Sequence, residues 1–444
     1  MKIIIHIDFN SFFATVEQQA NPRLRGKPIG VTGGDRLTRT VIGAASVEAK
    51  LRGVKTGMRI PEALKLCPDL TLVKGDSDKY VEINKKFLNI LKGYTDKMEV
   101  FSIDEVFLEI SKSEIRSTKY EIDCNVLNSN FELYTSNFLF NLALDIKEQI
   151  KKQAGEWITV SIGISYNKMM AKLAGSLYKP DGLVGIFDEQ SAMWILDRVK
   201  LDDVCGIGFR IKKRLNDMGV FNFSDLRKVP LPLLLTSFKS YGRILYNFAR
   251  GIDEREIVPF FEKEEVKSIG HRHTINRDVS DPEELKQILL KLCELVARRA
   301  RAKKLEGKTV SFWFRYAFLS LASHLSGGSV NLGGFGFSGS GMQTTIPYTS
   351  DGLDIFNASW NCFLKLWDGS PVRMVGVSLS NLKSATPQNL TFLEDINRRE
   401  VITRALDKIN DRYGEFTLQR GILLNSRNIR RMANSFMSDR RFKI

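Results

Sequence analysis

The sequence predicts an α+β protein of several domains, and three observations carry this prediction. The chain has 444 residues, which at about 100–200 residues per domain suggests two to four domains, each with its own core. Short apolar runs typical of buried strands alternate with segments whose apolar residues recur at helical spacing. One stretch, residues 173–252, is instead helical in pattern and interrupted by glycines.

The chain is basic, with 66 Lys and Arg residues against 51 Asp and Glu residues and a net charge of +15. This excess favours an anionic partner, either a nucleic acid or an acidic membrane surface. No apolar run approaches the roughly 18 residues of a membrane-spanning helix, and the N-terminus does not resemble a secretory signal. The five cysteines lie far apart, which argues against a zinc module or a disulfide framework and favours a reducing cytoplasm.

Residues 2–8 are almost continuously apolar and β-branched, so we expect a strand that is buried on both faces and ends at Asp8. A helix is expected to begin shortly after it. A carboxylate at the tip of a buried strand is very costly without a partner. The sequence therefore predicts a cation or a basic side chain beside Asp8.

The rest of the first half supplies the other elements of one α+β domain that ends near residue 172. A pair of apolar strands at 99–110 has Asp104 and Glu105 at its junction, and residues 111–136 are predicted to be a polar surface insertion. A further strand is expected at 157–164. Helices are expected at 44–53, 61–66, 80–92 and 137–153.

The helical stretch that follows contains a candidate helix-hairpin-helix at 203–215. Its turn between Gly206 and Gly208 could bring backbone N–H groups and a helix N-terminus to a phosphate, and Lys212 adds positive charge. A plain helix–helix turn is the alternative, because Gly-x-Gly alone is a weak signal.

After a linker at 253–263, the pattern predicts a second α+β module with one sheet, of the split βαβ type. The first helix of this module, expected at 282–304, ends in several basic residues, which could form either a solvated face or a patch that faces DNA. A glycine-rich loop is expected at 327–341 and a nucleic-acid-seeking basic arm at 420–444. Strands are expected at 266–275, 308–318, 342–348 and 372–382, and helices at 282–304, 351–367 and 396–413.

Three carboxylates, Asp8, Asp104 and Glu105, are expected at the ends of apolar strands. Mg²⁺ is held by a few carboxylates together with substrate phosphates. Two such ions about 3.5–4 Å apart can stabilise the attacking and the leaving oxygen of an in-line phosphoryl transfer. From the residues alone, acids that merely terminate strands are an equal alternative.

Seven segments, in an order that spans about residues 1–385, resemble the motifs of the Y-family of translesion DNA polymerases, in particular its bacterial members. The segments are Asp8–Glu17, Ser102–Leu108, Gly163–Ala174, Lys179–Gly182, Val204–Gly208, Gly251–Arg255 and Lys267–Gly270. The resemblance implies a right-hand fold. Its parts would be a palm at 1–10 and 75–172, fingers at 11–74, a helical thumb at 173–252 and a little finger at 264–384, with a tail at 385–444.

The resemblance also implies a function, which is template-directed, low-fidelity translesion DNA synthesis. A primer 3′-hydroxyl would attack a deoxynucleoside triphosphate (dNTP) and release pyrophosphate. Asp8, Asp104 and Glu105 would hold two Mg²⁺ ions, or Mn²⁺ in their place, with the Phe9 carbonyl as a further ligand. A non-catalytic scaffold that binds DNA and the clamp is the main alternative, and a nucleotide cyclase on a related palm is a third.

For the incoming nucleotide, the resemblance implies a steric gate at Phe13, whose ring would collide with a ribose 2′-hydroxyl. Phe12 would lie beside the nucleotide, with core packing as its alternative role, and Lys168 would reach the triphosphate. Members of the family usually carry Tyr and Arg where this chain has Val47 and Lys50. Since Val47 donates no hydrogen bond and Lys50 lacks a bidentate fork, we expect weaker nucleotide binding.

The expected partners are primer-template DNA, dNTPs and a sliding clamp, and we expect a bacterial cytoplasmic monomer. A short peptide after the little finger resembles the clamp-binding motif of bacterial polymerases. Its expected clamp contacts are Gln388, Leu390 and Phe392, and the expected DNA contacts are Gly206, Gly208, Lys212, Arg272 and Arg315.

Overall fold

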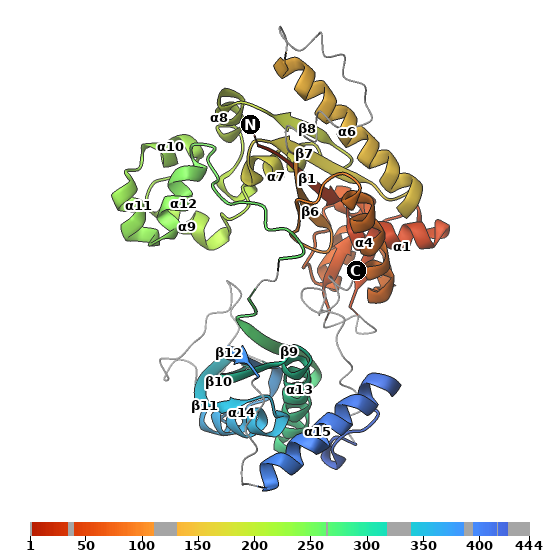
Figure 1. Cartoon of the computed structure of the whole chain (residues 1–444), viewed down its shortest axis with the longest axis vertical. Coiled ribbons are helices and arrows are strands. Elements are labelled where there is room, and N and C mark those ends of the chain that lie inside the picture. The colour runs from red at the N-terminus through yellow and green to blue at the C-terminus, as the bar shows by residue number, and fades with distance from the viewer. Residues whose placement is uncertain are drawn as a thin grey trace. The chain divides into compact units, whose positions relative to one another are not determined.

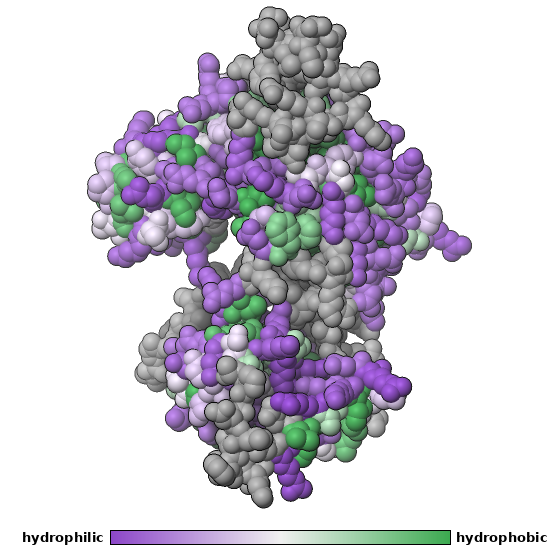
Figure 2. Space-filling view, in the orientation of Figure 1, coloured by the Kyte–Doolittle hydropathy of each residue, from purple (hydrophilic) through white to green (hydrophobic). Residues whose placement is uncertain are grey.

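The computed structural model divides the chain into two units, one up to residue 263 and one from 264 to 432 (Figure 1). Among the described residues, no helix is long and apolar enough to cross a membrane. Hydrophilic residues cover much of the coloured surface of each unit in Figure 2. The structure describes residues 2–33, 40–110, 131–262, 265–317, 339–385, 394–414 and 416–424.

The first unit is built on a five-stranded sheet whose central strand is β1. All seven residues of β1 are buried, as the apolar run at 2–8 predicts. Strands β6 and β7 flank β1 antiparallel, and β8 runs parallel to β7. In sheet order the strands are β5 (Met98–Val100), β6 (Glu105–Ile110), β1 (Ile3–Phe9), β7 (Val160–Ser165) and β8 (Leu183–Ile186).

Helices cover both faces of this sheet. The odd-numbered residues of β1 pack into one core with α4 (Ser77–Lys92) and α6 (Phe131–Ala154). The other face packs against α7 (Lys168–Leu177), where a Cβ added to Gly163 would meet the Ala171 carbonyl oxygen at 2.0 Å. Only glycine permits this close approach of helix to strand.

Residues between β1 and α4 form a small subdomain with a three-stranded sheet in the order β3-β2-β4. The helix expected at 44–53 is shorter than predicted, because residues 42–45 form a strand and the Ser46 hydroxyl caps α2 by accepting from the Ala49 N–H. The elements are α1 (Phe12–Ala20), η1 (Pro22–Leu24), β2 (Ile29–Thr32), β3 (Ile42–Ala45), α2 (Val47–Leu51), α3 (Ile60–Leu66) and β4 (Thr71–Lys74).

The stretch expected to be helical throughout, residues 173–252, is not, because β8 continues the central sheet past residue 172. The four-residue apolar run of β8 sits between helical patterns and gives no alternation by which to recognise it. The remaining helices share a core with α7. They are α8 (Glu189–Leu196), η3 (Leu201–Asp203), α9 (Phe209–Asp217), α10 (Phe223–Lys228), α11 (Leu231–Phe238) and α12 (Tyr241–Phe248).

The second unit has a four-stranded antiparallel sheet in the order β11-β10-β12-β9, with two long helices packed on one face. Its elements follow the predicted order. They are β9 (Ser268–Val279), α13 (Pro282–Ala302), β10 (Leu305–Tyr316), β11 (Gly339–Thr349), α14 (Gly352–Leu366) and β12 (Val372–Ser384).

Part of the tail after residue 384 is folded onto this second unit. The helix expected at 396–413 is α15 (Glu394–Tyr413), and the turn η5 (Gly421–Leu423) buries Leu423 in the same core as α13. Arg301 of α13 makes two hydrogen bonds to the Asp407 carboxylate of α15, at 2.6 and 2.9 Å. The start of the segment expected to be a free basic arm therefore packs against the protein.

Three other predictions fall wholly or mostly on residues outside those described. They are the surface insertion, of which only residues 131–136 are described and are helical, the glycine-rich loop at 327–341, and the clamp motif. At the end of that loop the prediction is wrong, because residues 339–341 begin strand β11. The arm beyond residue 424 is also outside the described part of the chain.

Candidate active site

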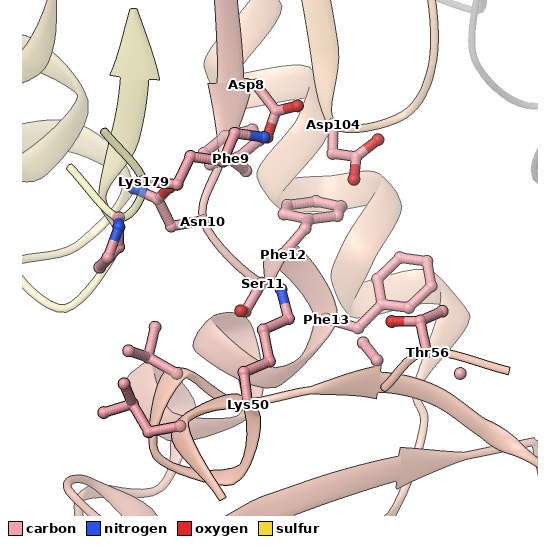
Figure 3. A pocket seen from close by; sticks show the side chains of 15 residues that line it. Asp8, Phe9, Asn10, Ser11, Phe12, Phe13, Lys50, Thr56, Asp104 and Lys179 are labelled. Atoms are coloured by element: carbon pink, nitrogen blue, oxygen red, sulfur yellow. The ribbon is translucent and has the colours of Figure 1, made fainter. Parts of the chain in front are cut away.

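A pocket of about 460 Å³ opens where β1 ends (Figure 3). In Figure 3, Asp8 and Asp104 lie at one side of this pocket and Lys50 at another, with Phe12 between them. The lining residues come from β1, α1, β3, α2 and the loops between elements: Asp8, Phe9, Asn10, Ser11, Phe12, Phe13, Gly43, Ala44, Val47, Lys50, Leu51, Thr56, Asp104, Lys179 and Pro180.

The antiparallel register of β1 and β6 brings the three predicted acids together. Asp8 pairs directly with Glu105 across the two strands. The Phe9 N–H donates to the Asp104 carbonyl at 3.0 Å, so Asp104 also lies at the end of β1. Asp8 and Glu105 are 97 residues apart in sequence, and the pairing of the strands makes them neighbours.

Two lysines pair with two of these acids. The Lys179 ammonium lies 2.9 Å from an Asp8 carboxylate oxygen, and the Lys172 ammonium lies 2.6 Å from both Glu105 oxygens. The prediction that a basic side chain lies beside Asp8 is therefore confirmed. Of the two, Lys179 also lines the pocket.

Burial makes negative charge costly at this site. It raises the pKa of Asp8 to about 7, although the Lys179 ammonium opposes the shift. Burial also raises the pKa of Asp104, against the hydrogen bond from Ser102. For Glu105, the Asp8 hydrogen bond and Lys172 outweigh burial and lower the pKa.

This donor set fits a hard divalent cation. It supplies carboxylate oxygens that are buried and whose negative charge the lysines offset only in part. Such a cation would favour the ionised form of each acid. Asp8 and Glu105 could therefore hold an ion directly, with Asp104 beside them.

His6 is a further residue of this group that sequence reasoning missed. A nitrogen of His6 and oxygens of Asp8 and Glu105 lie within 4.8 Å of one another. The His6 side chain is buried, and neither ring nitrogen has a hydrogen-bond partner among the described residues. Burial lowers the pKa of His6 to about 3, so the ring is neutral and could ligate a metal. Its position two residues before Asp8 on one strand was the available signal.

The structure does not place Lys168 in the pocket. Its ammonium donates to both Glu99 carboxylate oxygens at 2.7 Å and to the Glu256 carbonyl at 3.3 Å. The Lys168 side chain starts at the first residue of α7 and runs toward β5, away from the end of β1. Lys179 and Lys50 are the lysines that line the pocket.

The two phenylalanines at the start of α1 differ in exposure. Phe12 is 3% exposed and stacks on Phe9 at 4.7 Å between ring centroids, which matches the core role left open for it. Phe13 is half-buried and borders the pocket. Its ring stacks on Tyr80 with centroids 4.3 Å apart and planes 14° apart.

The family departures Val47 and Lys50 both lie on α2 and line the pocket. Partial burial and the neighbouring Lys179 charge lower the pKa of Lys50. Asn10 also borders the pocket, but its side chain accepts from the Ser161 hydroxyl at 2.8 Å and donates to Thr159 at 3.0 Å. Those bonds tie Asn10 to the β7 side of the sheet.

The glycine turn before α9 has the geometry of a tight hairpin. Gly206 has a positive φ of 112°, which other residues rarely adopt, and its carbonyl accepts from the Tyr241 hydroxyl at 2.7 Å. Gly208 is the residue before α9, and a Cβ there would meet open space. The Lys212 ammonium pairs with Asp202 at 2.7 Å on the surface.

In the second unit, Arg272 and Arg315 lie on the face of the sheet opposite α13 and α14. The Arg272 guanidinium lies over the Trp313 ring, 5.7 Å from its centroid. That ring covers Gly376, where a Cβ would come within 2.4 Å of it. Two arginines at the end of α13, Arg298 and Arg301, instead face acids of α15.

Three family models match the chain. The model described as the impB/mucB/samB family matches residues 7–176, and the model of that family's C-terminal domain matches residues 266–392. A model described as the thumb domain of DNA polymerase-iota matches residues 202–253.

Curated relatives match over nearly the whole chain. The DNA polymerase IV of Pelotomaculum thermopropionicum is 34% identical over 430 residues, which are 95% of each chain. The DNA polymerase IV of Staphylococcus aureus strain JH9 is 33% identical over 395 residues, 88% of this chain and 99% of the relative. The solved structure of a Y-family DNA polymerase chimera has a TM-score of 0.67 at 24% identity, over 85% of this chain and 98% of that chain.

Proposed function

Since the chain belongs to the impB/mucB/samB family, the Y-family of DNA polymerases, we propose that it carries out low-fidelity translesion synthesis by two-metal-ion nucleotidyl transfer. It is a DNA-directed DNA polymerase, and its substrates are primer-template DNA and dNTPs.

Asp8, Asp104 and Glu105 are proposed to hold two Mg²⁺ ions, with the Phe9 carbonyl as a further oxygen. Ions bound there would lower the pKa of the primer 3′-hydroxyl and stabilise the leaving pyrophosphate. The lysine pairs support this role, because they show that the site already needs positive charge beside Asp8 and Glu105. With a cation beside Asp8, the Lys179 ammonium, which already lines the pocket, could pair with a substrate phosphate instead.

Lys179 and Lys50 are proposed to bind the triphosphate of the incoming nucleotide. Both line the pocket that holds Asp8 and Asp104, which is where the α-phosphate must meet the primer hydroxyl. Lys50 supplies a point charge, and Val47 beside it on α2 supplies no hydrogen bond, so nucleotide binding should be weak. Replacing both with the residues usual in the family, Val47→Tyr with Lys50→Arg, should lower the Michaelis constant for dNTP.

Phe13 is proposed to exclude ribonucleotides as a steric gate. Its ring is half-buried at the pocket wall and is packed from behind, so it presents a fixed surface to a sugar. A 2′-hydroxyl on that sugar would collide with the ring.

The two units are proposed to contain palm, fingers, thumb and little finger. Residues 1–10 and 75–172 form the palm, together with β8, which extends it to about 186. Fingers at 11–74, a thumb up to 252 and a little finger from 264 complete the hand. We keep the clamp motif at 388–392 and a monomeric state as proposals that rest on the sequence.

DNA is proposed to contact the hairpin before α9 and the open face of the little-finger sheet. Gly206, Gly208 and Lys212 offer backbone N–H groups and charge at the hairpin, while Arg272 and Arg315 lie on the sheet. Contacts of this kind with phosphates should weaken steeply as salt rises. Lys212 is a weaker candidate than the two glycines, because Asp202 already pairs with it, and Arg298 and Arg301 are paired with acids of α15 in the same way.

The observation that carries the proposal is the meeting of three acids and the pocket-lining Lys179 at the end of a fully buried strand. Primer extension tests it, on damaged and undamaged templates, with each dNTP singly and with the clamp present and absent. We expect extension by the wild type and none by Asp104→Ala or Glu105→Ala. Glu82→Ala, which removes an exposed acid of α4, is the matched control and should keep full activity.

Absence of extension by the wild type would instead favour the scaffold alternative. A cyclic product formed from a triphosphate without primer would favour the cyclase. Loss of activity in the Glu82→Ala control would show that removal of an exposed acid also disrupts synthesis. The loss of activity in Asp104→Ala and Glu105→Ala would then no longer support their assignment as metal ligands.

A further inference from the structure

The ring of Tyr80, on α4, stacks on the ring of Phe13 without lining the pocket. Tyr80 is 2% exposed and is not among the pocket-lining residues, whereas Phe13 is. The two rings are nearly parallel, with planes 14° apart and centroids 4.3 Å apart. Tyr80 therefore occupies the space into which the Phe13 ring would have to retreat.

The hydroxyl end of Tyr80 is anchored to the helix that carries Phe13. It donates to a Glu17 carboxylate oxygen at 2.7 Å, and Glu17 lies four residues after Phe13 on α1. The other Glu17 oxygen lies 2.7 Å from the Lys79 ammonium. Burial and the Glu17 hydrogen bond raise the pKa of Tyr80, so its hydroxyl stays protonated and remains a donor.

This arrangement is unusual for a core, because the Glu17 carboxylate is only 5% exposed. A buried carboxylate is costly unless it is paired and hydrogen-bonded, and here Tyr80 and Lys79 provide both. Packing alone would be satisfied by an apolar residue at position 17. The polar pair instead fixes the tilt and depth of the Tyr80 ring, since a hydrogen bond is directional and apolar contact is not.

We propose that Tyr80, anchored by Glu17 and Lys79, is a positioning residue that holds the Phe13 ring at the pocket wall and so sets how strongly ribonucleotides are rejected. The inference rests on the proposed function, in which Phe13 is the steric gate. A steric gate can reject ribonucleotides only if the 2′-hydroxyl cannot push its ring aside. A half-buried Phe with space behind it could change rotamer and admit a ribose.

The test measures kcat/KM for one dNTP and for the matching ribonucleotide in single-nucleotide incorporation, and takes their ratio as the discrimination. Tyr80→Leu should lower this ratio about 10-fold or more, through a gain for the ribonucleotide, while kcat/KM for the dNTP stays within about threefold. Tyr80→Phe keeps the ring and loses the anchor, so it should lower the ratio less. Ile83→Ala, on the same helix and also packed on the core, is the matched control and should leave the ratio unchanged.

A double-mutant cycle separates positioning from general loosening of the fold. If Tyr80 acts through the gate, Tyr80→Leu should have little further effect on discrimination in a Phe13→Ala background. An unchanged ratio in Tyr80→Leu, or equal effects with and without Phe13, would overturn the inference. If Phe13→Ala itself did not lower the ratio, the proposed steric gate would be refuted. If the wild-type protein did not incorporate dNTPs at all, the proposed function would be refuted.

Discussion

The two sheets of the molecule place their charged residues in opposite environments. In the first unit, β1 is buried along its whole length, because helices cover both faces of its sheet. In the second unit, β10 alternates, with Val310, Phe312 and Phe314 buried and the residues between them half-exposed. Arg315 belongs to that half-exposed set, whereas Asp8 is 7% exposed.

This difference in burial suits the two sheets to different roles, one to metal binding and the other to DNA binding. A carboxylate at the end of a doubly covered sheet is desolvated, so its pKa rises and it demands a cation, as Asp8 does. Arg272, which is exposed on the second sheet, stays hydrated and can meet a phosphate without a large desolvation cost. The first sheet is therefore suited to hold metal ions, and the second to bind a polyanion along its surface.

The largest expected effect comes from removing the acid at the end of β1. Asp8→Ala should lower the rate of nucleotide incorporation by about a thousandfold or more, because one proposed metal ligand is lost. The same variant should be at least as resistant to heat as the wild type in metal-free buffer, since a costly buried charge is removed. Single-turnover incorporation and thermal unfolding check the two parts. Activity within tenfold of the wild type would contradict the assignment.

A second prediction separates two lysines of the palm. Lys179→Ala should raise the Michaelis constant for dNTP by about 10-fold or more, because a triphosphate contact is lost. Lys168→Met should leave that constant nearly unchanged but lower the free energy of unfolding by about 2 kcal/mol, since Glu99 loses its ammonium partner and keeps only the hydrogen bond from the Val258 N–H among those described. Steady-state kinetics and denaturant unfolding distinguish them. A raised Michaelis constant in Lys168→Met, with no change in Lys179→Ala, would instead support the triphosphate contact first expected for Lys168.

A third prediction concerns pH. The pKa of Asp8 is raised to about 7 in the folded protein, above its ordinary value near 3.9, so the folded state holds an extra proton between these values. Without metal, the stability contribution of Asp8 should therefore fall as pH rises from about 4 to 7. Divalent ions must displace this proton, so their affinity should rise over the same range and level off above it.

Calorimetric titration of Mn²⁺ at a series of pH values checks this dependence. Asp8→Asn, which cannot ionise, is the control and should show a flatter profile. A wild-type affinity that is constant from pH 5 to pH 7 would argue against a protonated Asp8 in the free enzyme.

The smallest effects should come from the open sheet of the second unit. Arg272→Ala and Arg315→Ala should each weaken DNA binding by only a few-fold and reduce the slope of log affinity against log salt by about 1. Arg298→Ala, whose side chain already pairs with Asp411, is the matched control and should change neither. Fluorescence anisotropy at several salt concentrations measures both quantities. An equal loss in all three variants would mean that overall charge, not this face, determines binding.

Much of the fold could be predicted because the patterns that specify it are local. The apolar run at 2–8 predicted a doubly buried strand, and desolvation of its terminal Asp8 predicted a basic neighbour, which is Lys179. The six elements of the second unit follow from alternation and helical spacing. The short β8 was missed because four apolar residues between helices carry no distinguishing period.

Of the two lysines that line the pocket, Lys50 was expected there from the resemblance, whereas Lys179 was not, because its place depends on packing between distant segments. Which lysine reaches the end of β1 depends on how closely α7 approaches β7, and the glycine contact at Gly163 sets that distance. The partners of Lys168 include Glu99, 69 residues away, which no local pattern indicates. The docking of α15 on α13 depends in the same way on the pairing of Arg301 with Asp407.

The central claim is that the acids at the end of β1 hold two divalent ions when substrates are bound. Electron paramagnetic resonance of Mn²⁺, with primer-template DNA ending in a dideoxynucleotide and the next dNTP present, counts the bound ions directly. We predict two ions per wild-type chain, fewer than two in Asp8→Asn, and two in the control Glu82→Gln. Two ions in Asp8→Asn at unchanged affinity, or one ion in the wild type, would contradict the claim.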